Sequence, residues 1–210
     1  MGCGALALDE LPEFPRQVLE NLRQPLEDGI ISVSRVQGTL QFPAKFILVA
    51  AMNPCPCGYA TDPDRQCICG ASQIIKYQKK ISGPLLDRID LHVEVPKVKF
   101  EKLADDSLAE DSVAIRQRIQ QARTQQLTRF KGLNLVTNSE MSQQQIKEFC
   151  QIDVATQQLL KTAVEQLQLS ARAYFRILKL ARTIADLASS VKVELAHVAE
   201  ALQYRPKISE

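Results

Sequence analysis

Two short apolar runs in the first part of the chain predict buried strands. Residues 5–8 read Ala-Leu-Ala-Leu and stop at two acids, and residues 46–51 read Phe-Ile-Leu-Val-Ala-Ala and stop shortly before Asn53 and Pro54. Apolar runs without alternation are typical of strands covered on both faces, as in a parallel sheet. Residues 91–95 alternate between apolar and polar side chains, which predicts a third strand with one wetter face.

The segments between the first two runs predict a helix and a hairpin. Residues 15–27 are expected to form the helix, and residues 31–42, with Gly38 among them, predict a β-hairpin. Together with the apolar runs, these elements indicate an α/β arrangement for the first part of the chain.

Turn-forming residues become rare in the second part of the chain. Residues 1–98 hold seven of the eight glycines and nine of the ten prolines, whereas residues 99–210 hold one of each. A segment so poor in turn formers is typical of helices. The expected helices are residues 115–130, with Ile115, Ile119, Ala122 and Phe130 on one face and Gly132 at the end; 142–150, capped by Ser142; 153–167, capped by Asp153; 170–189; and 193–203.

This change of composition predicts two domains: an α/β segment over residues 1–98 and a helical segment over 113–207, joined by a linker over 99–112. The net charge of +2 excludes no class of partner. The longest apolar run, residues 46–52, is far shorter than the about 20 residues of a membrane helix, and no secretory leader opens the sequence. We therefore expect no membrane partner and a cytoplasmic location.

Polar side chains follow both apolar runs directly. Asp9 and Glu10 end the first run, and Asn53 follows the second. Ligands of open α/β sheets bind at the carboxyl ends of the strands, where one acid can hold Mg²⁺ and the next can activate a water for attack on a γ-phosphate. The alternatives are a solvated turn after the first strand and an ordinary Asn-Pro turn after the second.

Four cysteines form two matched pairs within one short segment. Cys55 and Cys57 precede nine residues, and Cys67 and Cys69 follow them. Four thiolates in such a loop can close a tetrahedral Zn²⁺ site. Reduced free cysteines and a redox role stay open as alternatives.

Several arginines are candidates for contacts with phosphate. Arg88 precedes the third expected strand and suits phosphoryl transfer on a neighbouring subunit, unless it pairs with Asp87 or Asp90. Arg35 lies near the tip of the expected hairpin, where it either reaches nucleic acid or belongs to a plain surface hairpin. A basic edge of the 170–189 helix either binds phosphate or is merely solvated: Arg172, Arg176, Lys179 and Arg182.

Taken together, these motifs resemble the AAA+ ATPases of the magnesium-chelatase class, and within it the bacterial ComM (YifB) group. Residues 8–14 resemble the Walker B segment of that group, and residues 52–58 resemble its sensor-1 segment with the cysteine loop. Residues 82–91 resemble the arginine-finger stretch. Residues 170–174 and 181–185 resemble the sensor-2 helix of the lid. The resemblance implies part of a P-loop NTPase core followed by an all-α lid, and it implies ATP and Mg²⁺ as cofactors.

The resemblance also implies roles for individual residues. Asp9 would bind Mg²⁺, Glu10 would activate water and Asn53 would be sensor 1. Arg88 would be the finger that acts on the nucleotide of a neighbouring subunit in a hexameric ring. Two further positions carry roles by the same resemblance, in the lid and in the ring's pore: Arg172, with Arg176 as the second choice, would be the sensor-2 arginine, and Arg35 would face DNA.

The family's phosphate-cradling motif, Gly-x-x-x-x-Gly-Lys-Ser/Thr, is not among the 210 residues. We therefore expect this sequence to be the C-terminal part of a longer ATPase or a truncated reading frame. We also expect a gap in the sheet between the 46–51 and 91–95 strands, and no ATP turnover by this chain alone. By the resemblance, the intact protein would remodel DNA by branch migration during natural transformation. The alternatives are a zinc-bearing, non-enzymatic DNA-binding or adaptor module and a magnesium-chelatase motor subunit.

Overall fold

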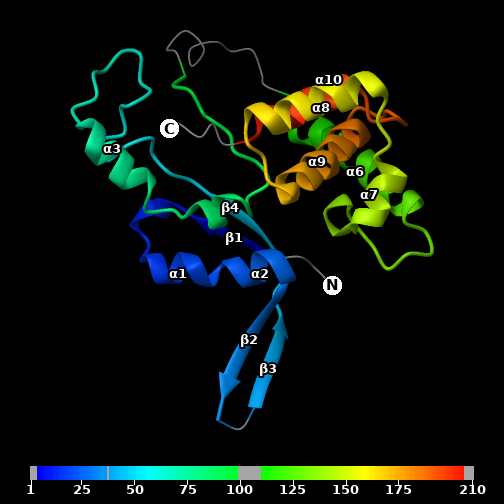
Figure 1. Ribbon diagram of the computed structural model, residues 1–210, viewed down its shortest axis with the longest axis horizontal. Coiled ribbons are helices and arrows are strands. Elements are labelled where there is room, and N and C mark those ends of the chain that lie inside the picture. The colour runs from blue at the N-terminus through cyan, green and yellow to red at the C-terminus, as the bar shows by residue number, and fades with distance from the viewer. Residues whose placement is uncertain (1–3, 37, 99–109, 206–210) are drawn as a thin grey trace. The chain divides into compact units, whose positions relative to one another are not determined.

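The computed structural model describes residues 4–36, 38–98 and 110–205 (Figure 1). Most of the expected linker, residues 99–109, and the last two residues of the expected helical domain lie outside the described residues. The chain divides into two compact units, and each is described by itself. Unit 1 holds the described residues up to Ile89 together with Glu94–Val98. Unit 2 holds Asp90–Val93 and the described residues from 110 onward.

Two parallel strands form the centre of unit 1. β1 (Gly4–Leu8) pairs with β4 (Phe46–Ala50), with Leu6 opposite Leu48 and Leu8 opposite Ala50. Both apolar runs are therefore strands, as predicted.

The expectation that these strands are covered on both faces is wrong. Ile47 and Val49 are 59% and 58% exposed, whereas Leu6, Leu8 and Leu48 are half-buried. Successive side chains of a strand point to opposite faces, so only one face of the pair is covered within the described part of unit 1.

The covered face packs near a broken helix that follows a 3-10 turn. The predicted helix over 15–27 is present but breaks at Leu22. Pro25 explains the break, because proline has no N–H to donate and its ring clashes with the carbonyl four residues earlier. The core here consists of four almost fully buried side chains: Leu11, Leu19, Ile81 and Leu85. The elements are η1 (Leu11–Glu13), α1 (Arg16–Asn21) and α2 (Arg23–Asp28).

The predicted hairpin is confirmed as β2 (Ile30–Arg35) and β3 (Gly38–Pro43), paired antiparallel (Figure 1). It begins where Gly29, at a φ of 66°, ends α2 in the left-handed region that favours glycine. After β4, unit 1 continues with α3 (Ala71–Gln78) and α4 (Gly83–Leu86).

The strand predicted over residues 91–95 is not formed. The gap expected between it and the 46–51 strand is therefore not seen among the described residues, because only the 46–51 strand is present to border it. The alternation of side chains there does not follow burial, because Leu91, Val93 and Val95 are all exposed. A strand also needs a neighbouring backbone, and the His92 N–H donates instead to the carbonyl of Tyr204, at 2.9 Å.

Unit 2 is helical, as the composition predicts. Ser142, Asp153 and Ser170 cap their helices by accepting backbone N–H groups, which confirms the first two as predicted caps. The elements are α6 (Ser112–Arg129), η2 (Asn138–Glu140), α7 (Gln143–Phe149), α8 (Val154–Gln166), α9 (Ala171–Leu187) and α10 (Leu195–Gln203). Among the described helices, none combines the length and the apolar character that a membrane span requires.

The core of unit 2 surrounds α9. Phe130, Ile146, Leu160, Ile177 and Val198 are almost fully buried there. Burying an aliphatic or aromatic side chain of this size contributes about 1.5–3 kcal/mol. α6 contributes to this core only through its C-terminal half. The expected apolar face of that helix is therefore wrong at Ile115 and Ile119, which are exposed, and right at Ala122 and Phe130.

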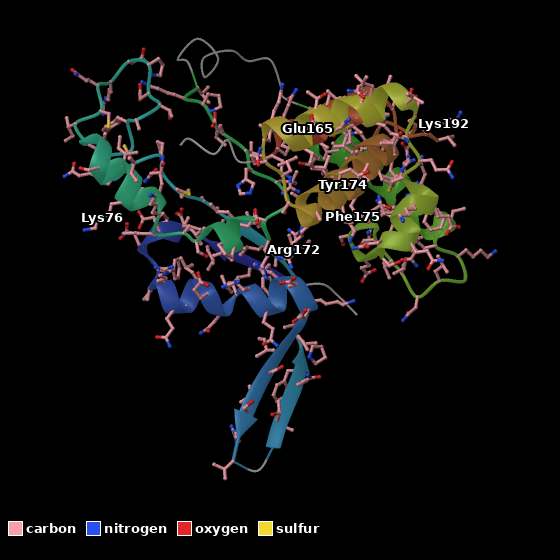
Figure 2. The ribbon with its side chains drawn as sticks, viewed as in Figure 1. Lys76, Glu165, Arg172, Tyr174, Phe175 and Lys192 are labelled. Atoms are coloured by element: carbon pink, nitrogen blue, oxygen red, sulfur yellow. The ribbon has the colours of Figure 1, made fainter. Side chains whose placement is uncertain are left out.

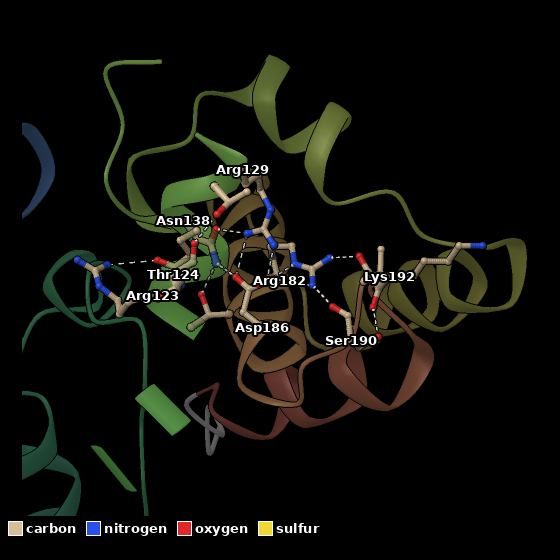
Figure 3. A network of polar contacts seen from close by, with 12 residues as sticks. Arg123, Thr124, Arg129, Asn138, Arg182, Asp186, Ser190 and Lys192 are labelled. Carbon is tan, nitrogen blue, oxygen red and sulfur yellow. Dashed lines mark hydrogen bonds and ion pairs between the residues drawn. The ribbon is translucent and has the colours of Figure 1, made fainter. Parts of the chain in front are cut away.

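A buried ionic network joins α9 to α6 and η2 (Figure 3). The Arg182 Nε donates to Asp186 Oδ1 at 3.0 Å, and the Arg129 Nη1 donates to Asp186 Oδ2 at 2.9 Å. Asn138 Nδ2 donates to the same carboxylate at 2.8 Å. Arg182 is only 2% exposed, so its expected place on a basic phosphate-binding edge is wrong.

We predict that Asp186→Asn lowers the free energy of unfolding of unit 2 by about 3–5 kcal/mol, because two arginines then lose the carboxylate that neutralises them. Chemical denaturation followed by circular dichroism measures this change. Glu165→Gln removes one exposed carboxylate from α8 and is the matched control. Equal stability of the two variants would contradict a stabilising role for the network.

Candidate functional site

The parallel pair of strands brings the predicted Walker B acids and the sensor-1 amide to one edge of the sheet. Asp9 and Glu10 follow β1, and Asn53 follows β4 with only two residues between. The pairing extends past both strands, because the Ala51 N–H donates to the Leu8 carbonyl and the Leu11 N–H donates to the Ala51 carbonyl, both at 2.9 Å. Asp9, Glu10 and Asn53 are all exposed, so a ligand at this edge can reach them.

The backbone turns sharply at the second acid. Glu10 has a φ of 51° and a ψ of 47°, in the left-handed region. A residue other than glycine costs roughly 1–3 kcal/mol there, and such strain concentrates at functional sites. The Glu10 N–H donates to Asp9 Oδ1 at 2.9 Å, which fixes this turn. One oxygen of Asp9 therefore supports the turn, and the other oxygen is not used by this bond.

Tyr77 of α3 is a neighbour of this edge that the sequence did not reveal. Its side chain is buried, and burial, followed by the negative charge of Glu13 and with a smaller effect of Glu10, raises the pKa of its hydroxyl. The backbone of Asn53 hydrogen-bonds with this hydroxyl and acts in the opposite direction. Nothing in the local sequence links Tyr77 to Asn53, because 23 residues including the cysteine loop lie between them.

The four predicted cysteines converge in unit 1. The Sγ atoms of Cys55, Cys57, Cys67 and Cys69 all lie within 4.8 Å of one another. Three of the separations are 3.4 Å (Cys55 to Cys57), 3.5 Å (Cys57 to Cys67) and 3.7 Å (Cys55 to Cys67). A tetrahedral zinc with Zn–S bonds of about 2.3 Å requires sulfur atoms about 3.8 Å apart. The cluster therefore fits the donor set and the size of a structural zinc site.

The thiols of this cluster differ in acidity. Backbone N–H groups at Tyr59 and Ile68 lower the pKa of Cys57 to about 6. The pKa of Cys67 rises to about 12, because burial and the neighbouring sulfur atoms outweigh a backbone hydrogen bond at Cys69. Burial, first of all, also raises the pKa of Cys69. Sulfur atoms this close cannot all ionise without a cation, and a bound divalent metal would supply that cation.

The loop that carries the cluster is tied at several points. Gly58, at a φ of 82°, donates its N–H to the Cys55 carbonyl at 3.0 Å and so forms the turn between the first cysteine pair and the loop. The Gln78 side chain donates to the Pro54 carbonyl at 3.1 Å. Lys97 Nζ donates to Asp64 at 2.9 Å. The loop is therefore anchored to α3 and to the 94–98 segment.

Arg88, the predicted finger, is engaged within unit 1. Its guanidinium pairs with Glu27 and also donates to the Pro84 carbonyl at 2.6 Å. Its side chain is only 9% exposed. Glu27 was neither of the partners considered from the sequence, Asp87 and Asp90, because it lies 61 residues away along the chain.

The basic residues of α9 fall into two groups. Arg172 lies on the first turn of α9 and is exposed (Figure 2). Arg176 lies one turn further on and pairs with Asp90 at 3.0 Å. Further along, Lys179 donates to the Ser139 carbonyl at 2.7 Å and Arg182 belongs to the buried network. Of the predicted basic edge, only Arg172 is therefore exposed, while Arg176 and Lys179 are half-buried and Arg182 is buried.

The hairpin presents Arg35 at the end of β2. Arg35 is exposed and pairs with Gly38 across the strands. One face of the hairpin below it is apolar and exposed, with Val33 opposite Leu40.

Comparison with models of known protein families shows which family the chain is related to. The family model described as magnesium chelatase, subunit ChlI, matches residues 2–103, and the model of the C-terminal region of the same subunit matches residues 109–205. The chain belongs to the magnesium-chelatase-like family. The resemblance drawn from the motifs is thereby confirmed. Membership implies a P-loop NTPase-type core, which here contributes a small sheet, followed by a helical C-terminal part.

Curated relatives within this magnesium-chelatase-like family include competence protein ComM of Haemophilus influenzae, which is 43% identical over 206 residues. The uncharacterized protein YifB of Escherichia coli is 39% identical over 203 residues, and YifB of Salmonella typhimurium is 37% identical over 203. These matches cover 96–98% of this chain but only 39% of each relative. The chain therefore spans about two fifths of the length of the curated relatives it matches.

We predict that the purified chain binds one Zn²⁺ through the four cysteines. Cys67→Ser/Cys69→Ser should abolish binding, because two sulfur ligands do not close a tetrahedral site. Metal analysis after dialysis measures the stoichiometry. Cys150→Ser, which changes a cysteine in unit 2 outside the cluster, is the control.

The affinity for zinc should fall as the pH is lowered, since the thiols regain the protons that zinc displaces. Unchanged zinc content in the double variant would contradict the site.

Proposed function

We propose that this chain is the C-terminal part of a ComM-like AAA+ ATPase that couples ATP hydrolysis to DNA remodelling. The observation that carries the proposal is the meeting of Asp9, Glu10 and Asn53 at the carboxyl edge of the β1–β4 pair. The relationship to a competence protein supports DNA as the partner. As part of the proposal, residues 1–98 belong to the ATPase core, 99–112 to a linker and 113–207 to the lid.

The edge residues fit the chemistry of phosphoryl transfer. Asp9 would hold Mg²⁺, which supplies positive charge beside the nucleotide phosphates and favours oxygen ligands. Glu10 is an exposed carboxylate that can accept the proton of an attacking water. Asn53 carries an amide that can orient the same water by hydrogen bonding. Because backbone hydrogen bonds fix both ends of the edge, these groups need little reorganisation before they act.

The arginines complete the proposal at subunit boundaries. Arg88 would exchange Glu27 for the phosphates of a neighbouring nucleotide when a hexameric ring assembles, since its planar fork suits either anion. Arg172 is exposed on the first turn of α9, which supports it over Arg176 as the sensor-2 residue. Arg35 would contact DNA from the end of the hairpin.

The phosphate-cradling motif is not among the 210 residues, so we expect no ATP turnover by this chain in isolation. A chimera supplies the rest of the protein: this chain replaces the matching 206-residue region of Haemophilus influenzae ComM. The chimera should hydrolyse ATP when Mg²⁺ is present. Glu10→Gln should lower that rate by about 100-fold or more, because the general base is lost.

The matched control for this experiment is Asp28→Asn. It removes another exposed carboxylate, at the end of α2 and away from the sheet edge, and should leave the rate unchanged. Equal rates for the Glu10→Gln and Asp28→Asn chimeras would overturn the role of Glu10. Turnover by the isolated chain would show that other groups hold the phosphates.

A second candidate function is a zinc-bearing, non-enzymatic DNA-binding or adaptor module, favoured by the four converging sulfur atoms. In that case DNA binding would depend on Cys67 and Cys69, and Glu10→Gln would have no effect in any assay. A third candidate, a magnesium-chelatase motor subunit, can be distinguished from these two by experiment. Only for that candidate should a porphyrin stimulate ATP hydrolysis.

A further inference from the structure

A second feature of unit 1 is a groove between the segment after β1 and the helix α3. The groove encloses about 740 Å³. Four cationic side chains line it: Arg16 from α1, one lysine from α3 and two lysines that directly follow α3. Two of its apolar lining residues are Phe14 and Ile75. The three lysines are Lys76, Lys79 and Lys80. No residue of the groove has a role in the proposed nucleotide site.

The groove concentrates positive charge in a part of the chain whose other charged residues are mostly acidic. Residues 1–98 carry 10 basic and 11 acidic side chains. The groove nevertheless gathers four of the basic ones and a single acid, Glu13, which pairs with Lys80 at 3.1 Å. Hydrogen bonds from Ser82 and Arg23 lower the pKa of the Glu20 carboxyl, and the nearby charge of Arg16 adds a smaller effect in the same direction. Among the described residues, Lys76 and Lys79 have no carboxylate partner within ion-pair distance.

The lysines gather at the C-terminal end of α3. Lys76 lies on its last turn, and Lys79 caps it three residues later with a φ of −71° and a ψ of −4°, so their side chains are neighbours as in a helix. Lys80 follows directly in the turn after the helix. Figure 2 shows Lys76 projecting outward from α3. Ile75, directly before Lys76 in α3, is 50% exposed, and Phe14 is half-buried. The groove thus combines unpaired positive charge with apolar surface that is open to solvent.

We propose that this groove binds the phosphodiester backbone of single-stranded nucleic acid. Lys76 and Lys79 neutralise phosphates, and Ile75 and Phe14 offer apolar surface to an unstacked base, as in other grooves that track single strands. A duplex offers its phosphates but keeps the faces of its bases stacked, so they are not available to Ile75 and Phe14. The inference rests on the proposed function in its choice of DNA as partner. The site itself is separate from both Arg35 and the Asp9–Glu10 edge.

The test uses the 210-residue chain and a fluorescently labelled oligothymidylate, with binding followed by anisotropy over a series of salt concentrations. Lys76→Gln/Lys79→Gln should weaken binding roughly tenfold or more at 0.1 M salt, and should make the slope of log affinity against log salt about 1.4 less steep, for two lost single-strand contacts. The matched control is Lys131→Gln/Lys192→Gln, which removes the same charge from exposed positions of unit 2 and should bind like the unchanged chain.

Further arms fix the chemistry of the ligand. Lys76→Arg/Lys79→Arg keeps the charge and should retain binding, and circular dichroism checks that each variant is folded. ATP and inorganic phosphate, at the same phosphate concentration as the oligothymidylate, should displace it poorly, and a duplex of equal length should bind more weakly. Equal weakening by both glutamine pairs, full competition by the small phosphates, or preference for the duplex would each overturn the proposal.

The outcome separates this inference from the proposed function. Glu10-dependent ATP hydrolysis in the chimera, together with unchanged DNA binding by Lys76→Gln/Lys79→Gln, would reject the groove alone. Lysine-dependent binding of single strands without Glu10-dependent hydrolysis would reject the ATPase and leave the groove in place.

Discussion

The parallel pairing of β1 with β4 is the constraint on which the candidate nucleotide site depends. Parallel strands end at the same edge of a sheet, so residues more than 40 positions apart in sequence meet there. Two backbone hydrogen bonds beyond the strands, between Ala51 and its neighbours Leu8 and Leu11, extend this pairing into the turns that carry the acids and the amide. The left-handed backbone at Glu10 then takes the chain directly into η1, which lines the basic groove. One pairing therefore positions the proposed nucleotide site and one wall of the basic groove.

Unit 2 is organised instead around a buried charge. Asp186 receives hydrogen bonds from Arg129, Arg182 and Asn138, and it thereby fixes how α9 packs against α6 and η2 (Figure 3). A buried carboxylate is tolerated only when its neighbours satisfy it, so this network specifies the orientation of α9 about its axis. That orientation buries Arg182 and leaves Arg172 exposed.

Elements that depend on neighbouring residues were predicted well from the sequence, whereas contacts between residues far apart in sequence were not. The two apolar runs, the hairpin and the caps Ser142 and Asp153 depend on neighbouring residues, and the structure has all of them. The four cysteines lie within 15 residues of one another, so their convergence was also readable. By contrast, Arg88 pairs with a residue 61 positions away, and Arg129 pairs with a carboxylate 57 positions away. The predicted strand over residues 91–95 has no neighbouring strand among the described residues. Helical periodicity gave the angle of Arg182 on its helix, but not what covers it.

The central claim is that the edge formed by Asp9, Glu10 and Asn53 is half of a magnesium-nucleotide site. The most direct measurement is a crystal structure of the chimera with Mg²⁺ and a non-hydrolysable ATP analogue. The account predicts the metal beside the Asp9 carboxylate, directly or through one water, and the γ-phosphate facing Glu10 and Asn53. Nucleotide and metal bound elsewhere, with this edge facing only solvent, would contradict it.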